Sequence, residues 1–139
     1  MLVSDAGRRY LLVVGEPPEG SSTAPTMIYD VREGTWTAGT PRPLPGNHHA
    51  AEVINNQLYL FGGLAEGEGS VQIASLQATA TGVRVSWSLG PNLPHPSGSA
   101  ATALIDGKVC LFLLPDPECT LKAPRDVEVR NDSLQRSAC

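Results

Sequence analysis

The sequence predicts an all-β fold built from repeated four-stranded antiparallel sheets. Three observations predict it: a repeat with a 51-residue period, a high content of turn-forming residues, and the lack of any helical pattern. The 139 residues include 14 Gly and 12 Pro, about 19% of the chain against an average of roughly 12%. Nowhere do apolar residues recur at i, i+3, i+4 and i+7 over a helical length. We therefore expect many short strands joined by turns and almost no helix.

The repeat is anchored on Trp36 and Trp87, which lie 51 residues apart. The same offset aligns the chain from Trp36 to Phe61 with its second copy without a gap. The matching pieces are Trp36–Gly39 with Trp87–Gly90, Pro43 and Pro45 with Pro94 and Pro96, Ala50–Ile54 with Ala101–Ile105, and Leu58–Phe61 with Val109–Phe112. A repeat of this length indicates one supersecondary unit used more than once.

Each copy resolves into short strands separated by turn signals. The expected strands, in chain order, are 10–14, 26–31, 35–38, 50–54, 58–61, 71–77, 83–89, 101–105 and 109–112. Asn55–Asn56 and Asp106–Gly107 are two-residue hairpin signals, because a type I′ turn requires positive φ at both central residues. Gly34 and Thr81–Gly82 mark two further turns. Four short antiparallel strands in about 50 residues are typical of one propeller blade.

The chain resembles the kelch repeats, β-propeller modules that are also found in galactose-oxidase-like proteins. The residues that carry this resemblance are Gly62–Gly63 directly after a strand, Tyr29–Asp30 seven residues before Trp36, and the proline-rich segment 41–45 that runs into His48–His49. The resemblance covers roughly residues 10–114. It departs from the pattern at Gly15–Glu16 in the first copy and at Leu113–Leu114 in the third, because a glycine pair is expected at each of these two places.

Physical chemistry explains why a blade needs these residue types at the motif positions. Gly62 and Gly63 allow positive φ and close approach of neighbouring blades. Trp36 and Trp87, each on an outer strand, supply a large buried area between sheets, and Tyr29 belongs to the same motif. We expect Trp36 to be buried, so that Trp36→Ala costs about 3–5 kcal/mol.

The predicted organisation is an incomplete propeller. A kelch-repeat segment is expected over 1–121, with blade repeats at roughly 10–57 and 58–108 and a partial one at 109–121, followed by a polar C-terminal tail over 122–139. Within that tail 127–130 alternates like a strand, and 131–139 is expected to be disordered. Closing a ring of four blades needs about 200 residues. We therefore expect self-association or pairing with complementary blades.

Charge and hydropathy exclude several classes of protein. The net charge is −4 and no basic run is longer than Arg8–Arg9, so neither a nucleic-acid binder nor a membrane-surface binder is expected. The longest apolar runs are far short of the roughly 20 residues of a spanning helix. The N-terminus does not resemble a signal peptide, and Cys110, Cys119 and Cys139 lack metal-ligand spacing. A cytoplasmic location is favoured, although the compartment stays unknown.

No pattern of catalytic residues is present, so we expect a protein that is not an enzyme and needs no cofactor. The serines lack a nucleophile-elbow signature, and Glu66 and Glu68 lie on a glycine-flanked loop that preorganises them poorly. His48 and His49 are adjacent and cannot both face one metal ion from a strand. The copper site of galactose-oxidase relatives needs tyrosine, cysteine and histidine together, and no cysteine lies beside the tyrosines here.

The long loops predict where binding occurs. In a four-stranded antiparallel blade the 2–3 and 4–1 loops emerge on one face, and here these are the long ones. Long loops on a rigid scaffold commonly carry binding residues, and in the kelch family this face often takes a peptide or protein. The candidate partner-binding residues are Arg42, His48, Glu66, Glu68 and His95. The alternatives are a fragment of a propeller enzyme or carbohydrate-binding relative, and a truncated product without independent function.

Overall fold

The computed structural model describes residues 2–3, 7–15, 19, 23–64, 69–79, 82–96, 98–105, 108–112, 127–130 and 133–136. These residues form three four-stranded sheets, each antiparallel throughout, and no helix. The described part of the chain therefore includes no helix that could cross a membrane. The all-β fold class is confirmed.

Each sheet is one blade, and its strands are neighbours in sequence. Blade 1 contains β1 (Leu2–Val3), β2 (Arg9–Val14), β3 (Ala24–Asp30) and β4 (Thr35–Arg42). Blade 2 contains β5 (Ala50–Ile54), β6 (Gln57–Phe61), β7 (Val71–Thr79) and β8 (Gly82–Leu89). Blade 3 contains β9 (Ala101–Ile105), β10 (Lys108–Phe112), β11 (Val127–Arg130) and β12 (Ser133–Arg136). All nine strands expected over residues 10–112 are present, and the strand-like pattern at 127–130 is β11.

One expectation for the end of the chain is wrong. Residues 133–136, expected to be disordered, form β12 and pair with β11, which in turn pairs with β10. These two strands give blade 3 the same four-stranded plan as the others. Polar strands at a sheet edge have little hydrophobic periodicity, which is why the sequence pattern did not reveal β12.

The tight turns follow the residue types that the sequence places there. Asn55 and Asn56 have φ of 47° and 62°, as a type I′ turn requires. Gly34 has φ of 67°, and its backbone N–H donates to the Asp30 carbonyl at 2.9 Å. The second hairpin signal, Asp106–Gly107, lies outside the described residues.

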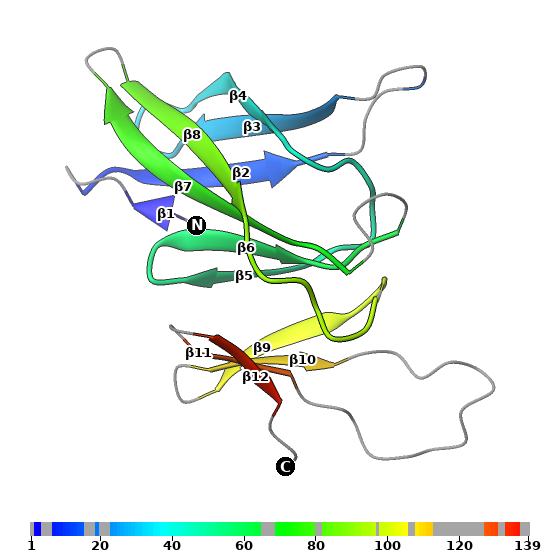
Figure 1. Ribbon diagram of the computed structural model, residues 1–139. Helices are drawn as coiled ribbons and strands as arrows, with labels where there is room; N and C mark the ends of the chain where they lie inside the picture. Colours follow the sequence, from blue (N-terminus) through cyan, green and yellow to red (C-terminus); the bar gives the residue numbers. More distant parts are fainter. Residues whose placement is uncertain are drawn as a thin grey trace.

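The blades stack face to face and bury one apolar core between each pair (Figure 1). Between blades 1 and 2 the core consists of Leu2, Tyr10, Ile28, Leu58, Leu60, Ala74 and Val85. Between blades 2 and 3 it consists of Ala50, Ile54, Phe61, Val71, Leu93, Val109 and Leu111. Blade 2 is thus apolar on both faces, because alternate residues of each strand point to opposite sides of the sheet.

The two anchor tryptophans have different surroundings. Trp87 is partly buried against the core between blades 1 and 2, and its Nε1 donates to the Thr40 carbonyl of β4 at 3.0 Å. Trp36 packs on Tyr29, with ring centroids 4.9 Å apart, but is 53% exposed. The prediction of a buried Trp36 is therefore wrong. Blade 1 covers the face of blade 2 that carries Trp87, whereas the described residues place no sheet over the face that carries Trp36.

Candidate functional site

The long connections between strands gather at one end of the stack. The three whose residues are mostly described are the β4–β5 connection at 43–49, the β6–β7 connection at 62–70 and the β8–β9 connection at 90–100. Strand direction alternates within each blade, so these connections share an end while the tight turns at 31–34 and 55–56 lie at the opposite end (Figure 1). We call the described residues of these three connections the loop face. This arrangement was predicted from the loop lengths.

Backbone hydrogen bonds tie the three connections to one another. The N–H of Leu64 donates to the Asn47 carbonyl, and the N–H of Leu93 donates to the Gly69 carbonyl, both at 2.8 Å. The N–H of Ser99 donates to the His48 carbonyl at 2.9 Å. Each bond joins connections that are distant in sequence, so the loop face is fixed by the fold before any partner arrives.

The glycine pair after β6 makes this close approach possible. Gly62 and Gly63 have φ of 63° and 107°. A Cβ on Gly63 would lie 2.7 Å from ring atoms of His49 and 2.8 Å from the Asn47 carbonyl oxygen. Glycine alone fits both the backbone conformation and the space.

Arg42 organises the loop face from inside. It lies at the end of β4 and is only 4% exposed. Its Nη2 donates to the carbonyls of Gly15, at 3.1 Å, and Gly46, and its Nη1 lies 2.9 Å from Nε2 of His49. The structure therefore gives Arg42 a role in holding the loops in place, and a partner at the surface would not reach its guanidinium.

The contact with Arg42 also fixes the state of His49. A guanidinium can only donate, so Nε2 of His49 accepts and the ring proton sits on Nδ1. Burial, followed by the charges of Arg42 and His48, lowers the pKa of His49 to about 4. At neutral pH His49 is an uncharged acceptor. Sequence reasoning missed this pair, because a buried arginine at a strand end depends on loops distant in the chain.

The other predicted site residues lie in three different situations. His48 is exposed on the loop face with φ of 55°, and its Nδ1 lies 2.7 Å from Oδ1 of Asn47. His95 is exposed on the neighbouring connection, close to where Pro96 approaches Gly69. Glu66 and Glu68 lie outside the described residues. The fold thus brings His48, His95 and the buried Arg42 to one end of the stack.

Gln72 is a further residue that sequence reasoning missed. It lies in β7, is fully buried, and its Oε1 accepts from the backbone N–H of Leu44 at 3.0 Å. This bond links the β4–β5 connection to blade 2. The signal that could have revealed it is its position between Val71 and Ile73 in the strand, since a buried polar group needs a partner.

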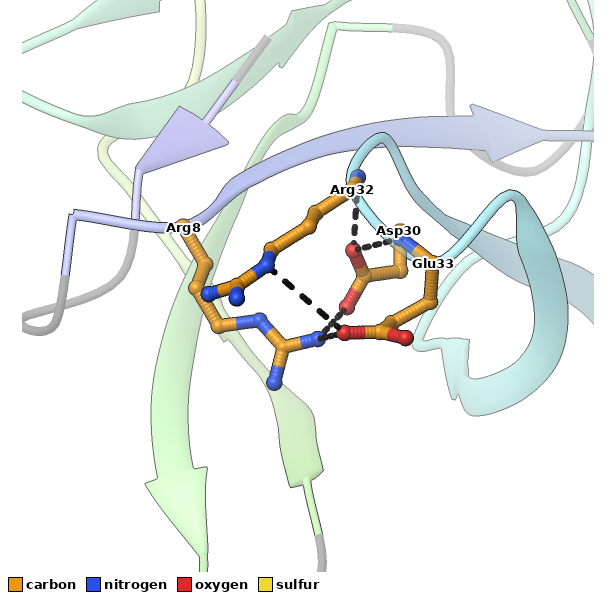
Figure 2. A network of polar contacts seen from close by, with 4 residues as sticks. All are labelled: Arg8, Asp30, Arg32 and Glu33. Carbon is orange, nitrogen blue, oxygen red and sulfur yellow. Dashed lines mark hydrogen bonds and ion pairs between the residues drawn. The ribbon is translucent and has the colours of Figure 1, made fainter.

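A second polar cluster lies at the opposite end of blade 1, around the β3–β4 turn (Figure 2). Nη2 of Arg8 lies 2.7 Å from Oδ2 of Asp30 and 2.9 Å from Oε1 of Glu33. Oδ1 of Asp30 accepts from the backbone N–H groups of Arg32 and Glu33, at 2.9 and 3.1 Å.

The electrostatics of this cluster indicate a turn-stabilising role. Burial alone would raise the pKa of Asp30, but the hydrogen bonds from Glu33 and Arg32 and the charge of Arg8 outweigh it, so the pKa of Asp30 falls below its ordinary 3.8. The Asp of the Tyr29–Asp30 pair therefore stabilises the β3–β4 turn. Among the described residues, no group of three or more potential metal ligands comes together.

The comparisons with known proteins agree with the blade architecture. The chain is 32% identical over 101 residues to the kelch-like protein terF of Aspergillus terreus, a match that covers 68% of this chain and 22% of the relative. The chain thus spans about a fifth of the length of that curated relative. No family model matches the sequence. Four-stranded antiparallel blades, a glycine pair after the second strand and this similarity place the chain in the kelch-repeat family, as an incomplete β-propeller.

Proposed function

We propose that this kelch-repeat module binds a protein or peptide segment at its loop face and carries out no chemistry of its own. One observation supports the site above the others. Three connections from different parts of the chain are joined by backbone hydrogen bonds, and between them they present exposed side chains that the fold does not use in its core. Preorganised loops of this kind bind without a large entropic cost of ordering.

The exposed residues indicate the chemistry of the partner. Among the described residues of the loop face they are Pro43, His48, Leu64, Pro91, Asn92, Pro94, His95 and Pro96. Apolar rings and a leucine supply contact area, while the imidazoles supply hydrogen-bond donors and acceptors. The leucine and proline side chains carry no charge, so an extended peptide with apolar side chains fits them better than a highly charged one.

The experiment is a selection of binding peptides from a displayed random library, followed by titration of one selected peptide. The test variant is His48→Asn/Leu64→Ala/His95→Ala, in which asparagine tolerates the positive φ at position 48. We expect its affinity to be at least about tenfold weaker, a loss of about 1.4 kcal/mol. Arg84→Ala, an exposed substitution near the turn end of β8, is the control and should bind like the wild type.

Two results would overturn this proposal. If the wild type and the triple variant bind the selected peptide with equal affinity, the binding site does not lie on the loop face. Equal weakening by Arg84→Ala would show that the loss reflects general destabilisation.

A further inference from the structure

Each blade of the stack has two faces of different kinds. We define the front face as the one turned toward the preceding blade and the back face as the one turned toward the following blade. The front face of blade 2 carries Leu58, Leu60 and Trp87, which pack against blade 1. Its back face carries Ile54 and Phe61, which pack against blade 3.

The pairing register identifies the equivalent front-face positions in blade 1. In blade 2 one row across the sheet runs from Leu58 through Ala74 to Trp87. In blade 1 the row that ends at the other tryptophan runs from Leu11 through Tyr29 to Trp36. Two residues further along, Val13 pairs with Met27 as Leu60 pairs with Gln72. Leu11 and Val13 therefore correspond to Leu58 and Leu60.

These equivalent positions differ sharply in burial. Leu58 and Leu60 are 8% and 1% exposed, and their counterparts in blade 3, Val109 and Leu111, are 0% and 1% exposed. Leu11 and Val13 are 41% and 49% exposed. Blades 2 and 3 each lie behind another blade, whereas the described residues place nothing in front of blade 1. Its front face has the composition of a blade interface, and no described blade covers it.

The back face of blade 3 shows the same contrast at the other end of the stack. Ile54 and Phe61 of blade 2 are 9% and 1% exposed. Their counterparts at the 51-residue offset, Ile105 and Phe112, are 50% and 36% exposed. Within the described residues, the front face of blade 1 and the back face of blade 3 are therefore both open, although faces of these two kinds pack together between blades 1 and 2 and between blades 2 and 3.

We propose that a second copy of this chain covers these faces, and that two copies close into a six-bladed ring. The three blades that the structure describes are fewer than the four to eight of closed propellers, and two copies supply six, within that range. The back face of blade 3 in each copy would cover the front face of blade 1 in the other. The same contact is then made twice about a two-fold axis, so the assembly closes instead of growing. This inference is independent of the proposed function.

The internal interface also shows which side chains would meet. Phe61 on the back face of blade 2 shares a core with Leu111 on the front face of blade 3. Phe112 corresponds to Phe61, and Val13 corresponds to Leu111. The ring therefore places Phe112 of one copy against Val13 of the other. A charge at either position would be buried without a partner, which is strongly unfavourable.

The test is the mass of the 139-residue chain at micromolar concentration, measured by sedimentation equilibrium. The wild type should form a single species of about 29 kDa, twice the chain mass of 14.7 kDa. Val13→Glu and Phe112→Arg alone should each weaken association at least about a hundredfold, giving monomers. Mixed together they should recover the 29-kDa species, because one interface is then native and the other sets the introduced carboxylate against the introduced guanidinium. The control is Gln77→Glu, which places a charge on an exposed residue of blade 2, away from the two open faces. It should leave the dimer intact.

Recovery in the mixture separates loss of the interface from loss of folding, because misfolded chains would not recover on mixing. A wild-type chain that stays at 14.7 kDa would overturn the proposal. So would polymers that lengthen with concentration, since they would show that the contact does not close. Dimers that persist in both single variants would place the interface elsewhere.

Discussion

At the scale of single residues, the loop face depends on an arginine and a histidine buried together. Arg42 links β4 to the carbonyls of two loops, and His49 accepts from it only while its ring is neutral. The β4–β5 connection also depends on Gly63, whose lack of a Cβ leaves room for the His49 ring. The functional surface is thus positioned by residues that a partner would not touch.

The state of His49 gives a prediction about pH. Its pKa is about 4 in the folded chain and 6.5 when unfolded, so between these values the unfolded chain binds a proton that the folded chain does not. The stabilisation is fully present above pH 6.5 and is lost as the pH falls toward 4. Because the ring is only half-buried and solvent screens its interactions, the loss amounts to about 2 kcal/mol. Urea unfolding from pH 7 to pH 4 measures this slope.

His49→Gln is the matched variant, since it removes the titrating ring and keeps a side-chain acceptor. It should flatten the dependence between pH 6.5 and 4. Asp30 does not interfere, because its lowered pKa places its own loss of stability below that window. An unchanged slope in His49→Gln would assign the dependence to another group.

At the scale of strands and turns, the sequence predicted most of the fold because local chemistry decides it. Asn55–Asn56 adopts the φ values that its turn requires, and the apolar runs on either side become β5 and β6. β12 and the burial of Arg42 were not predicted. Both depend on contacts with segments far away in the chain, which no local pattern of residues encodes.

The two tryptophans were equivalent in sequence and differ in the structure, which gives a prediction for their strands. Trp87→Ala removes packing between blades and the hydrogen bond to the Thr40 carbonyl, and should cost about 3 kcal/mol. Trp36→Ala removes a half-exposed ring on the open face of blade 1 and should cost about 1 kcal/mol. Chemical denaturation of the monomeric Val13→Glu background measures both. Equal costs would show that Trp36 is covered within a single chain.

At the scale of the whole molecule, the 51-residue repeat becomes a stack in which equivalent strands of successive blades face one another. The hydroxyl of Thr102 in β9 donates to the Ala51 carbonyl of β5 at 3.0 Å, and these residues are 51 positions apart. β4 and β8 meet in the same way at the outer side, through Trp87. The sequence repeat predicted the blades. The order of the blades in the stack decides which blade faces are covered and which are exposed, and the repeat alone does not show this.

The contact between β4 and β8 tests this stacking most directly. The chain has only two tryptophans, so its indole N–H groups give two resonances that single substitutions can assign. Nuclear Overhauser measurements should connect the Trp87 indole N–H to backbone protons around Thr40, 47 residues earlier in the chain. Contacts from the Trp87 indole to residues of blade 2 alone would contradict the stack of blades described above.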